Sequence, residues 1–336
     1  MTVEESLLSG ARGGDAAAFS ELTEPHRREL HVHCYRLLGS VGDAEDLVQE
    51  TLLAAWRNID GFAGRSSVRT WLYRIATNRC LNALRDRDRR PVLASVPSAD
   101  HLPEPCRRGE VTWLEPSPDN AIEFDAPVPG PEAQVESREA VSLAFVAAVQ
   151  TMPPRQRAIL VLRDVLGYRG AEVADLLDTT EDAVASGLKR ARNALAGRES
   201  LDAPPLPNSP AERRVVAAFV TAFESGDVPA MIGLLTDGAW LSMPPLPHEY
   251  QGRDAIGGFF SGIVFVEGAP PVRLVPTRAN GQPAFGRYVC DPETGVAHAR
   301  GVMVLTLAGD RISRMTTFLG TEPFTRFGLP LTLPPG

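Results

Sequence analysis

The placement of proline most constrains how this chain of 336 residues can fold. Nine of its 29 prolines lie within residues 91–135, and a second cluster reads Pro-Pro-Leu-Pro-Asn-Ser-Pro over residues 204–210. Proline lacks an amide donor, so it interrupts helices and central strands. We therefore expect three compact blocks, at residues 5–90, 136–198 and 211–330, joined by an extended linker over 91–135 and a short linker over 199–210.

Charge is distributed unevenly along the chain. The net charge of −8 excludes a strongly basic, histone-like protein. Residues 57–90 nevertheless contain nine arginines and three acidic residues, whereas residues 91–135 contain two arginines and eight acidic residues. A basic segment beside an acidic one is typical of proteins that bind nucleic acids. The acidic linker is either a plain spacer or a mimic of nucleic acid.

Several protein classes are excluded by what the sequence lacks. The cysteines at 34, 80, 106 and 290 form no Cys-x-x-Cys pair, which predicts neither a disulfide framework nor a zinc ribbon. The segment His31-Val32-His33-Cys34 is a poor metal cluster, because residues two apart on a helix point to different faces. With no signal peptide and no apolar run of about 20 residues, we expect a cytoplasmic protein without metal, cofactor or membrane contact.

The first block has the periodicity of helices. Apolar residues of the segment 43–57 fall on one side, at Leu47, Val48, Leu52, Ala55 and Trp56, and Asp43 is the expected N-cap. The segment 68–84 has a similar apolar stripe, and its arginines lie mainly outside that stripe. One helix thus offers an apolar side to a core and a basic side to solvent or phosphate.

The second block reads as a helix-turn-helix. A short helix over 171–177 precedes a helix that opens at Thr179 or Thr180, where Thr179 and Asp182 fit a capping box. The third block differs, because a helix around 215–223 is followed by strand-like runs at 287–289, 298–305 and 312–315. Helices followed by strands predict an α+β domain there.

Two segments of the first two blocks resemble a known family. Asp43-Ala44-Glu45-Asp46-Leu47-Val48-Gln49-Glu50-Thr51, followed by Ala55-Trp56-Arg57, resembles the core-polymerase-binding helix of bacterial sigma-70 factors. Residues 62–79 resemble the promoter −10 reading segment of the extracytoplasmic-function (ECF) group, and residues 152–192 resemble its −35 reading domain. The resemblance implies two all-α domains in a dissociable, non-catalytic subunit whose partners are core RNA polymerase and promoter DNA.

The resemblance also implies roles for individual residues. Core binding would fall to Asp46, Gln49, Glu50 and Arg57. Recognition and melting of the −10 element would fall to Phe62, Arg65, Ser66, Ser67, Arg69, Trp71, Arg74, Asn78 and Arg79. Within that set, Phe62 and the loop over 64–67 would capture extruded bases and Trp71 would support the loop from beneath.

The −35 element would be contacted from the second helix of the helix-turn-helix. The residues implied there are Thr180, Glu181, Asp182, Ser186, Lys189, Arg190 and Arg192. This chain departs from the family pattern at Ala185 and Gly187, where a lysine and an arginine are common. The recognition helix also opens with acidic residues, so we expect weak duplex affinity at this element.

The third block resembles SnoaL-type polyketide cyclases and ketosteroid isomerases, which form a cone-shaped α+β barrel. Residues 219–228, 234–245 and 252–256 carry this resemblance. It implies a pocket, with Trp240, Met243, His248, Tyr250, His298 and Arg300 as its candidate lining residues. Catalysis, small-ligand sensing and protein contact all remain open for this block, and an anti-sigma protein or a small ligand is the partner it could take.

We interpret the sequence as an ECF sigma factor whose SnoaL-like third block modulates activity. One alternative is a one-component transcription regulator, in which the helix-turn-helix binds an operator and the third block senses a ligand. Another is an isomerase or cyclase tethered to a DNA-binding part. The segment 43–57 favours the sigma factor, because neither alternative needs a helix that docks on polymerase.

Overall fold

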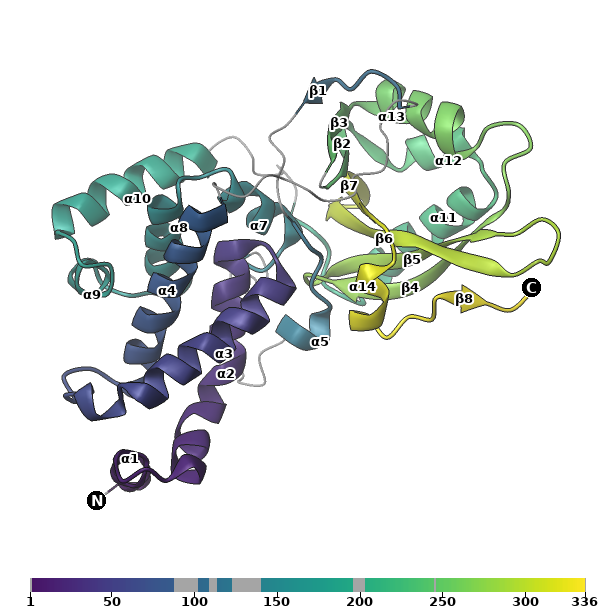
Figure 1. Ribbon diagram of the computed structural model, residues 1–336. Helices are drawn as coiled ribbons and strands as arrows, with labels where there is room; N and C mark the ends of the chain where they lie inside the picture. The colour runs from purple at the N-terminus through teal and green to yellow at the C-terminus, as the bar shows by residue number, and fades with distance from the viewer. Residues whose placement is uncertain are drawn as a thin grey trace. The chain divides into compact units, whose positions relative to one another are not determined.

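The chain forms two compact units, each described here by itself (Figure 1). The computed structural model describes residues 2–87, 102–108, 114–122, 140–195, 203–244 and 246–335. The first unit consists of the described residues within 1–93, 121–141 and 148–197. The second unit consists of the described residues within 94–120, 142–147 and 198–336. None of the helices in the described ranges is long and apolar enough to cross a membrane.

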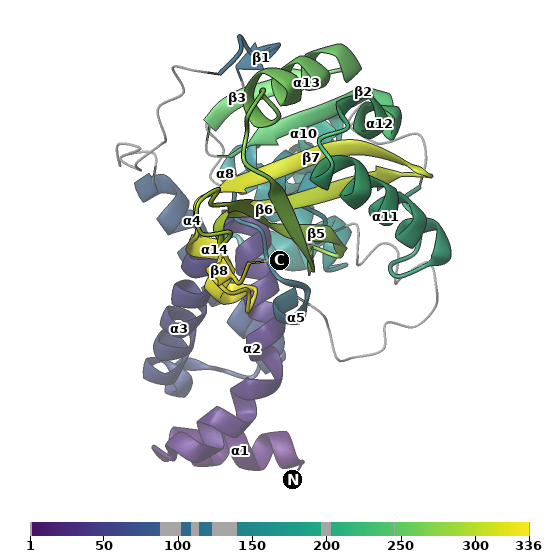
Figure 2. The same cartoon turned by 90° about the vertical axis from the view of Figure 1, so that its right-hand side faces the viewer.

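The first unit is all-helical. Its elements are α1 (Val3–Arg12), α2 (Ala16–Leu38), α3 (Val41–Arg57), the 3-10 turn Ile59–Gly61, α4 (Val68–Arg87), α8 (Pro154–Leu160) with the π-helical turn Val161–Val165, α9 (Gly170–Leu176) and α10 (Glu181–Leu195). The short helices α5 (Asp119–Ile122) and α7 (Leu143–Gln150) have residues in both units. Helices α2, α3 and α4 pack together, as Figure 2 shows.

Hydroxyl caps set the starts of the helices that carry the candidate sites. The expected cap at Asp43 is wrong: α3 begins two residues earlier, at Val41, and the Ser40 hydroxyl accepts from the Asp43 amide at 3.2 Å. Ser67 caps α4 in the same way, accepting from the Thr70 amide at 3.1 Å. The cap is Ser40, which follows the left-handed Gly39 and which the sequence analysis did not name.

The blocks predicted at 5–90 and 136–198 form one unit, where the sequence predicts two separate blocks. Buried Arg157 of α8 donates to the carbonyl oxygens of Leu37, of Gln150 at 2.9 Å and of Met152 at 3.2 Å. Buried Arg36 of α2 donates to the Ala140 carbonyl at 2.9 Å. The bonds from Arg157 to Leu37 and from Arg36 to Ala140 join residues more than 100 positions apart in the sequence, so no local pattern reveals them.

The helix-turn-helix is confirmed as α9, a turn and α10. Thr180 caps α10, accepting from the Ala183 amide at 3.2 Å, so of the two predicted starting points the chain uses Thr180. Gly187 is buried against α8, and a Cβ atom there would lie 2.6 Å from Ile159 Cδ1. The glycine therefore allows α8 and α10 to approach closely, and a basic side chain at 187 would overpack this contact.

The second unit is an α+β fold, as the sequence predicts. Its helices are α11 (Pro210–Glu224), α12 (Val228–Gly233), α13 (Arg253–Phe259) with the π-helical turn Phe260–Val264, and α14 (Glu322–Arg326). Its strands are β1 (Arg107–Arg108), β2 (Leu235–Met243), β3 (Leu246–Gln251), β4 (Val272–Ala279), β5 (Gln282–Cys290), β6 (Ala297–Ala308), β7 (Arg311–Leu319) and β8 (Thr332–Leu333).

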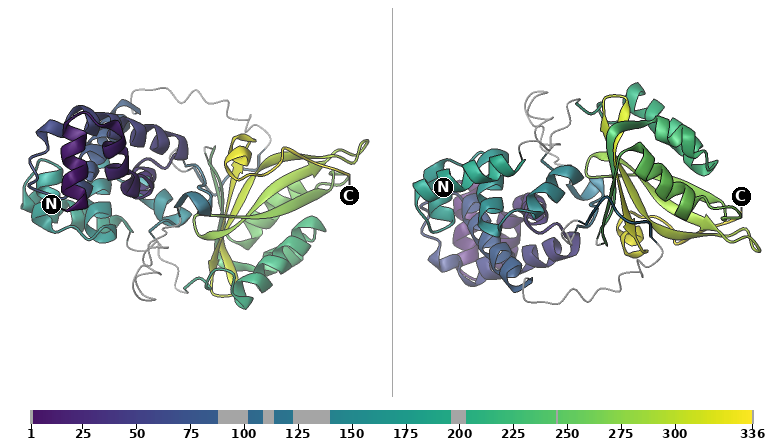
Figure 3. Two further views of the ribbon diagram at one scale, coloured as in Figure 1. Left: turned by 90° about the horizontal axis from the view of Figure 1, so that it is seen from below. Right: turned by 90° about the horizontal axis from the view of Figure 1, so that it is seen from above.

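These strands form one sheet in the order β1-β3-β2-β7-β6-β5-β4, with β8 paired to β6. Only the β2–β7 pair runs parallel among the described strand pairs. Helices α11, α12 and α13 cover the concave face of the curved sheet (Figure 3). An apolar core lies between them, with Phe219, Phe223, Phe260 and Phe285 among its rings.

Two stretches of the segment predicted as an extended linker are held by the second unit. Strand β1 pairs antiparallel with β3, with Arg107 opposite Glu249, and the Tyr250 hydroxyl donates to the Pro103 carbonyl at 2.7 Å. Further along, Asp119 accepts from the Gly281 amide at 2.7 Å. Composition predicts an extended chain, but the open edge of β3 provides main-chain partners that composition cannot reveal.

Candidate functional site

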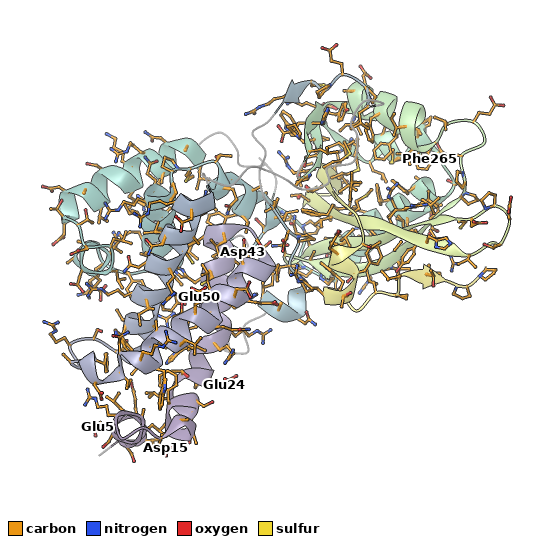
Figure 4. All side chains as sticks on the ribbon, in the orientation of Figure 1. Glu5, Asp15, Glu24, Asp43, Glu50 and Phe265 are labelled. Atoms are coloured by element: carbon orange, nitrogen blue, oxygen red, sulfur yellow. The ribbon has the colours of Figure 1, made fainter. Side chains whose placement is uncertain are left out.

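The predicted core-binding residues lie together on α3. Asp46, Gln49, Glu50 and Arg57 are all exposed, while Leu47, Val48, Thr51 and Ala55 of the same helix are buried. Figure 4 marks Glu50 and, near the start of the helix, Asp43. The spacing of 3 and 4 residues places the exposed set on one side of the helix.

One further member of that side escaped the sequence analysis. Leu53 is 55% exposed, and it follows Gln49 by four positions and Glu50 by three. The residues Asp46, Gln49, Glu50, Leu53 and Arg57 make up what we term the α3 face. The signal was available in the sequence, because Leu53 falls outside the apolar stripe of the segment 43–57. An exposed leucine among polar residues is the composition of a protein-binding surface.

The loop before α4 has a buried support and an exposed rim. Phe62 is only 6% exposed, and its ring packs on Trp71 with centroids 5.0 Å apart. Arg12 also donates to the Phe62 carbonyl. The sequence analysis assigned Phe62 to the capture of extruded bases, but its side chain is buried. Phe62 and Trp71 therefore support the loop together. The exposed rim consists of Arg65, Ser66 and Ser67.

Three predicted DNA-contacting arginines of α4 have acidic partners within the unit. Arg69 Nε donates to Glu29 at 2.8 Å, Arg79 donates to Glu50 at 2.6 Å, and Arg74 lies 3.6 Å from Asp175. Asn78 is exposed on the same helix. Exposed ion pairs contribute only about 0–1 kcal/mol, so phosphate can replace the partners of Arg74 and Arg79 at little cost.

Arg69 differs from those two because its pair is partly buried. Its guanidinium also lies 4.8 Å from the centre of the Tyr73 ring. Burial raises the pKa of Glu29, but hydrogen bonds from His26 and Arg69 outweigh that effect and leave the pKa below its ordinary value. Glu29 is therefore ionised and held by Arg69. Arg69 thus links α2 to α4, and this structural role accounts for the residue without any contact to a DNA phosphate.

The predicted −35 residues line the exposed side of α10. Glu181, Asp182, Ser186, Lys189 and Arg190 are all exposed. Arg192 makes two hydrogen bonds to Asp164, at 2.8 and 2.9 Å. A hollow of about 470 Å³ is lined by residues of both signs, including Glu181, Asp182, Lys189 and Arg192. The acidic opening of α10 therefore lies beside its basic residues, and weak duplex affinity stays a prediction.

The second unit contains a cavity of about 560 Å³. Buried apolar residues of the helices and the sheet line it, among them Phe223, Leu241, Phe260 and Met303. Of the six predicted lining residues, Met243 alone lies on this cavity. Three polar residues that the prediction missed, Glu267, Arg287 and Thr317, also line it.

The other five predicted lining residues lie elsewhere in the second unit. The Trp240 ring lies 5.6 Å from the Arg314 guanidinium, and the Tyr250 hydroxyl is used by Pro103. His248 is buried at the pairing of β1 with β3, whereas His298 and Arg300 are exposed on β6. The prediction named the polar and aromatic residues near the expected strands, but it could not tell which face of the sheet each one occupies.

The described ranges hold no group of three or more histidine, cysteine or acidic side chains that could bind a metal ion. In the segment that looked most like a metal cluster, His33 is instead buried with its Nε2 atom 2.8 Å from the Thr77 hydroxyl. Thr77 in turn donates to the Tyr73 carbonyl at 2.7 Å, so His33 Nε2–H is the donor to Thr77.

Comparison with known proteins gives the class. Residues 22–90 match Sigma-70 region 2, residues 142–195 match Sigma-70, region 4, and residues 216–315 match the SnoaL-like domain. Each match falls within one of the three blocks predicted from the prolines. Both DNA-reading regions of a sigma factor are therefore present, in the order in which sigma factors carry them.

Individual relatives give the group within that class. The chain is 47% identical over 327 residues to the ECF RNA polymerase sigma factor SigG of Mycobacterium tuberculosis, which covers 96% of this chain and 86% of that protein. It is 31% identical over 193 residues to SigM of the same organism, covering 57% of this chain and 83% of SigM. The crystal structure of the M. tuberculosis extracytoplasmic function sigma factor SigJ matches with a TM-score of 0.58 and 25% identity, covering 93% of this chain and 99% of that chain.

The chain belongs to the ECF RNA polymerase sigma factors, with a SnoaL-like domain at its C-terminal end. Sigma factors are transcription proteins and not enzymes. This membership decides against both the one-component regulator and the tethered isomerase or cyclase.

Proposed function

We propose that this chain binds core RNA polymerase through the α3 face and directs it to promoters. The α3 face is the observation that carries the proposal. It combines two carboxylates, an amide, a guanidinium and an exposed leucine on one side of a helix whose opposite side is buried. In a protein interface, an apolar centre contributes affinity through burial, and the polar residues around it fix the orientation of the partner.

Promoter contact falls to two other surfaces of the first unit. The exposed rim Arg65–Ser67, with Arg74, Asn78 and Arg79 of α4, serves the −10 element. The exposed side of α10 serves the −35 element. For each phosphate that an arginine neutralises, the logarithm of the binding constant falls with the logarithm of the salt concentration by a slope of about −0.9. Because the chain works on chromosomal DNA with the polymerase, its proposed place of action is the cytoplasm.

The second unit is proposed to modulate initiation through the linker. Residues 102–108 and 114–120 lie in sequence between the two sigma regions, yet both stretches are held by the second unit. Holding them shortens the chain that is free to connect the regions. A change in the second unit can thus change how the chain between the two DNA-reading regions is held.

The α3 face is tested by reversing its charge. In full-length protein, Asp46→Lys combined with Glu50→Lys is expected to weaken binding to core polymerase by about tenfold or more, because both side chains change sign at the contact. Retention on immobilised core enzyme measures the effect. Circular dichroism checks the fold, which should persist because both residues are exposed.

Two controls make this test specific. Glu21→Lys makes the same change of charge at an exposed position of α2, outside the α3 face, and it is expected to leave core binding unchanged. Asp46→Lys alone separates the interface from the loss of the Glu50–Arg79 pair. Wild-type retention by the double variant would reject the α3 face as the docking surface.

A further inference from the structure

The cavity of the second unit contains a cation without a partner. Arg287 lies on β5 between Phe285 and Val289, which share its face of the strand because alternate residues do so. Phe285 belongs to the apolar core, and Val289 lines the cavity with Arg287. A guanidinium therefore lies on the face of the sheet that carries the apolar core.

No protein group compensates this charge. Among the residues that the structure describes, no hydrogen bond or ion pair involves the side chain of Arg287, and its Nε atom is enclosed without a partner. Arg300 of the neighbouring strand, which has the same sign, acts on it electrostatically. The carboxylate that lines the same cavity, Glu267, is exposed in a loop and makes no ion pair with Arg287 among the described residues. Burial lowers the pKa of Arg287 below its ordinary value, with a further contribution from Arg300. A buried charge without a partner is destabilising unless a ligand supplies the counter-charge.

The rest of the lining fixes the chemistry of such a ligand. Its buried members are apolar side chains from α11, α13, β2 and β6, with Thr317 of β7 as the one other polar group among them. Phe265, labelled in Figure 4, packs on Phe223 and Phe260 and so supports this wall. The volume of about 560 Å³ lies in the range of small-molecule sites.

The entrance of the cavity is formed by exposed loop residues and by part of the linker between the two sigma regions. Val266, Glu267 and Gly268, in the loop that follows the π-helical turn, line the cavity and are exposed. Leu102, from the stretch that precedes β1, lines it too. An apolar tail in the cavity would therefore touch the segment that connects the two sigma regions.

We propose that this cavity binds an amphipathic monocarboxylate, with its carboxylate on Arg287 and its apolar tail among the phenylalanine and methionine side chains. A carboxylate accepts two parallel hydrogen bonds from a guanidinium, which matches the geometry of arginine. The apolar walls exclude a strongly hydrated polyanion. This site goes beyond the sigma function, and its test does not involve polymerase, so the failure of one leaves the other standing.

Decanoate and 1-decanol, titrated into the full chain by calorimetry, separate the head group from the tail. Wild-type protein is expected to bind decanoate at least about tenfold more tightly than 1-decanol, because only the carboxylate makes charge-assisted hydrogen bonds. In Arg287→Met the affinity for decanoate is expected to fall about tenfold or more, while 1-decanol binds at least as tightly as before. The matched control is Arg300→Met, which removes an exposed arginine on the neighbouring strand and should retain the preference for decanoate.

Three results would overturn the proposal. They are equal affinities of the wild-type chain for the two probes, no heat from decanoate, and an Arg287→Met variant that binds decanoate as the wild type does. Circular dichroism verifies that the variant folds. If it does not fold, the preference of the wild-type chain for decanoate over 1-decanol decides by itself.

Discussion

Each unit of this sigma factor contains an arginine whose Nε atom is enclosed, the buried Arg157 in the first and the partly exposed Arg287 in the second. Arg157 is 4% exposed and donates to three main-chain carbonyl oxygens of its own unit. Arg287 donates to no described residue, although its Nε is enclosed. A buried cation that the fold satisfies is part of the architecture, whereas one that the fold leaves unsatisfied marks a place for something else.

The same distinction applies to the arginines near the surface. Arg69 is held by Glu29 between α2 and α4, so the fold explains it. Arg65 is exposed in the loop before α4 and is available to DNA. Sequence resemblance assigned both to the −10 element, and partners within the fold separate them. The arginines that we propose contact DNA are therefore fewer than the arginines of the basic segment.

The largest expected change in stability follows from replacing Arg157, whose side chain has hydrogen-bond partners within the fold. Arg157→Met keeps the length of the side chain but removes every donor, leaving the carbonyls of Leu37, Gln150 and Met152 without this partner. We expect the free energy of unfolding to fall by about 3 kcal/mol, since each unsatisfied buried group costs about 1–3 kcal/mol. Urea unfolding of the full chain measures it. The control is Arg190→Met, at an exposed position. If the two variants lowered the free energy of unfolding by equally small amounts, the hydrogen bonds of Arg157 would not stabilise the fold, and Arg157 would not differ from Arg287.

The second prediction concerns a buried histidine that the first unit keeps neutral. Burial lowers the pKa of His33 to about 3, and the charges of Arg36 and Arg69 act in the same direction. The unfolded chain therefore binds a proton that the folded chain does not bind, between about pH 6.5 and pH 3. Stability is expected to fall on acidification through this window, by about 2 kcal/mol at pH 5.

His33→Gln should remove this part of the pH dependence of unfolding. The slope against pH is the informative quantity, because the substitution also removes the packing of the His33 ring on Tyr73. His298→Gln, at an exposed position of the second unit, should leave the slope as it is in the wild type. A His33→Gln variant with the wild-type slope would contradict a neutral, buried ring.

The smallest expected effect has the opposite sign. Without ligand, Arg287→Met should raise the free energy of unfolding by about 1 kcal/mol, because it removes an uncompensated charge and adds apolar contact. Thermal unfolding of the full chain measures this, with Arg300→Met as the control. A large loss of stability would show that the fold does satisfy Arg287, which would erase the difference between the two arginines.

Much of the first unit could be predicted from local sequence. The helix over 43–57 and the helix-turn-helix follow from apolar periodicity and capping residues, because those signals act over one or two turns. The start of α3 was missed by two residues, since Ser40 and Asp43 are both competent caps. At Gly187 the sequence suggested a missing DNA contact, whereas Ile159 shows that the glycine serves packing.

The sequence by itself determined the class of this protein, the order of its regions and the position of the α3 face. It did so because those properties depend on motifs and on residues within a few positions of one another. The tertiary structure decided which arginines have partners, which side chains line the cavity, and that two described stretches of the acidic linker, residues 102–108 and 114–120, belong to the second unit. Partners such as Glu50 and Arg79, or Tyr250 and Pro103, come from distant parts of the chain, and only folding brings their atoms within bonding distance.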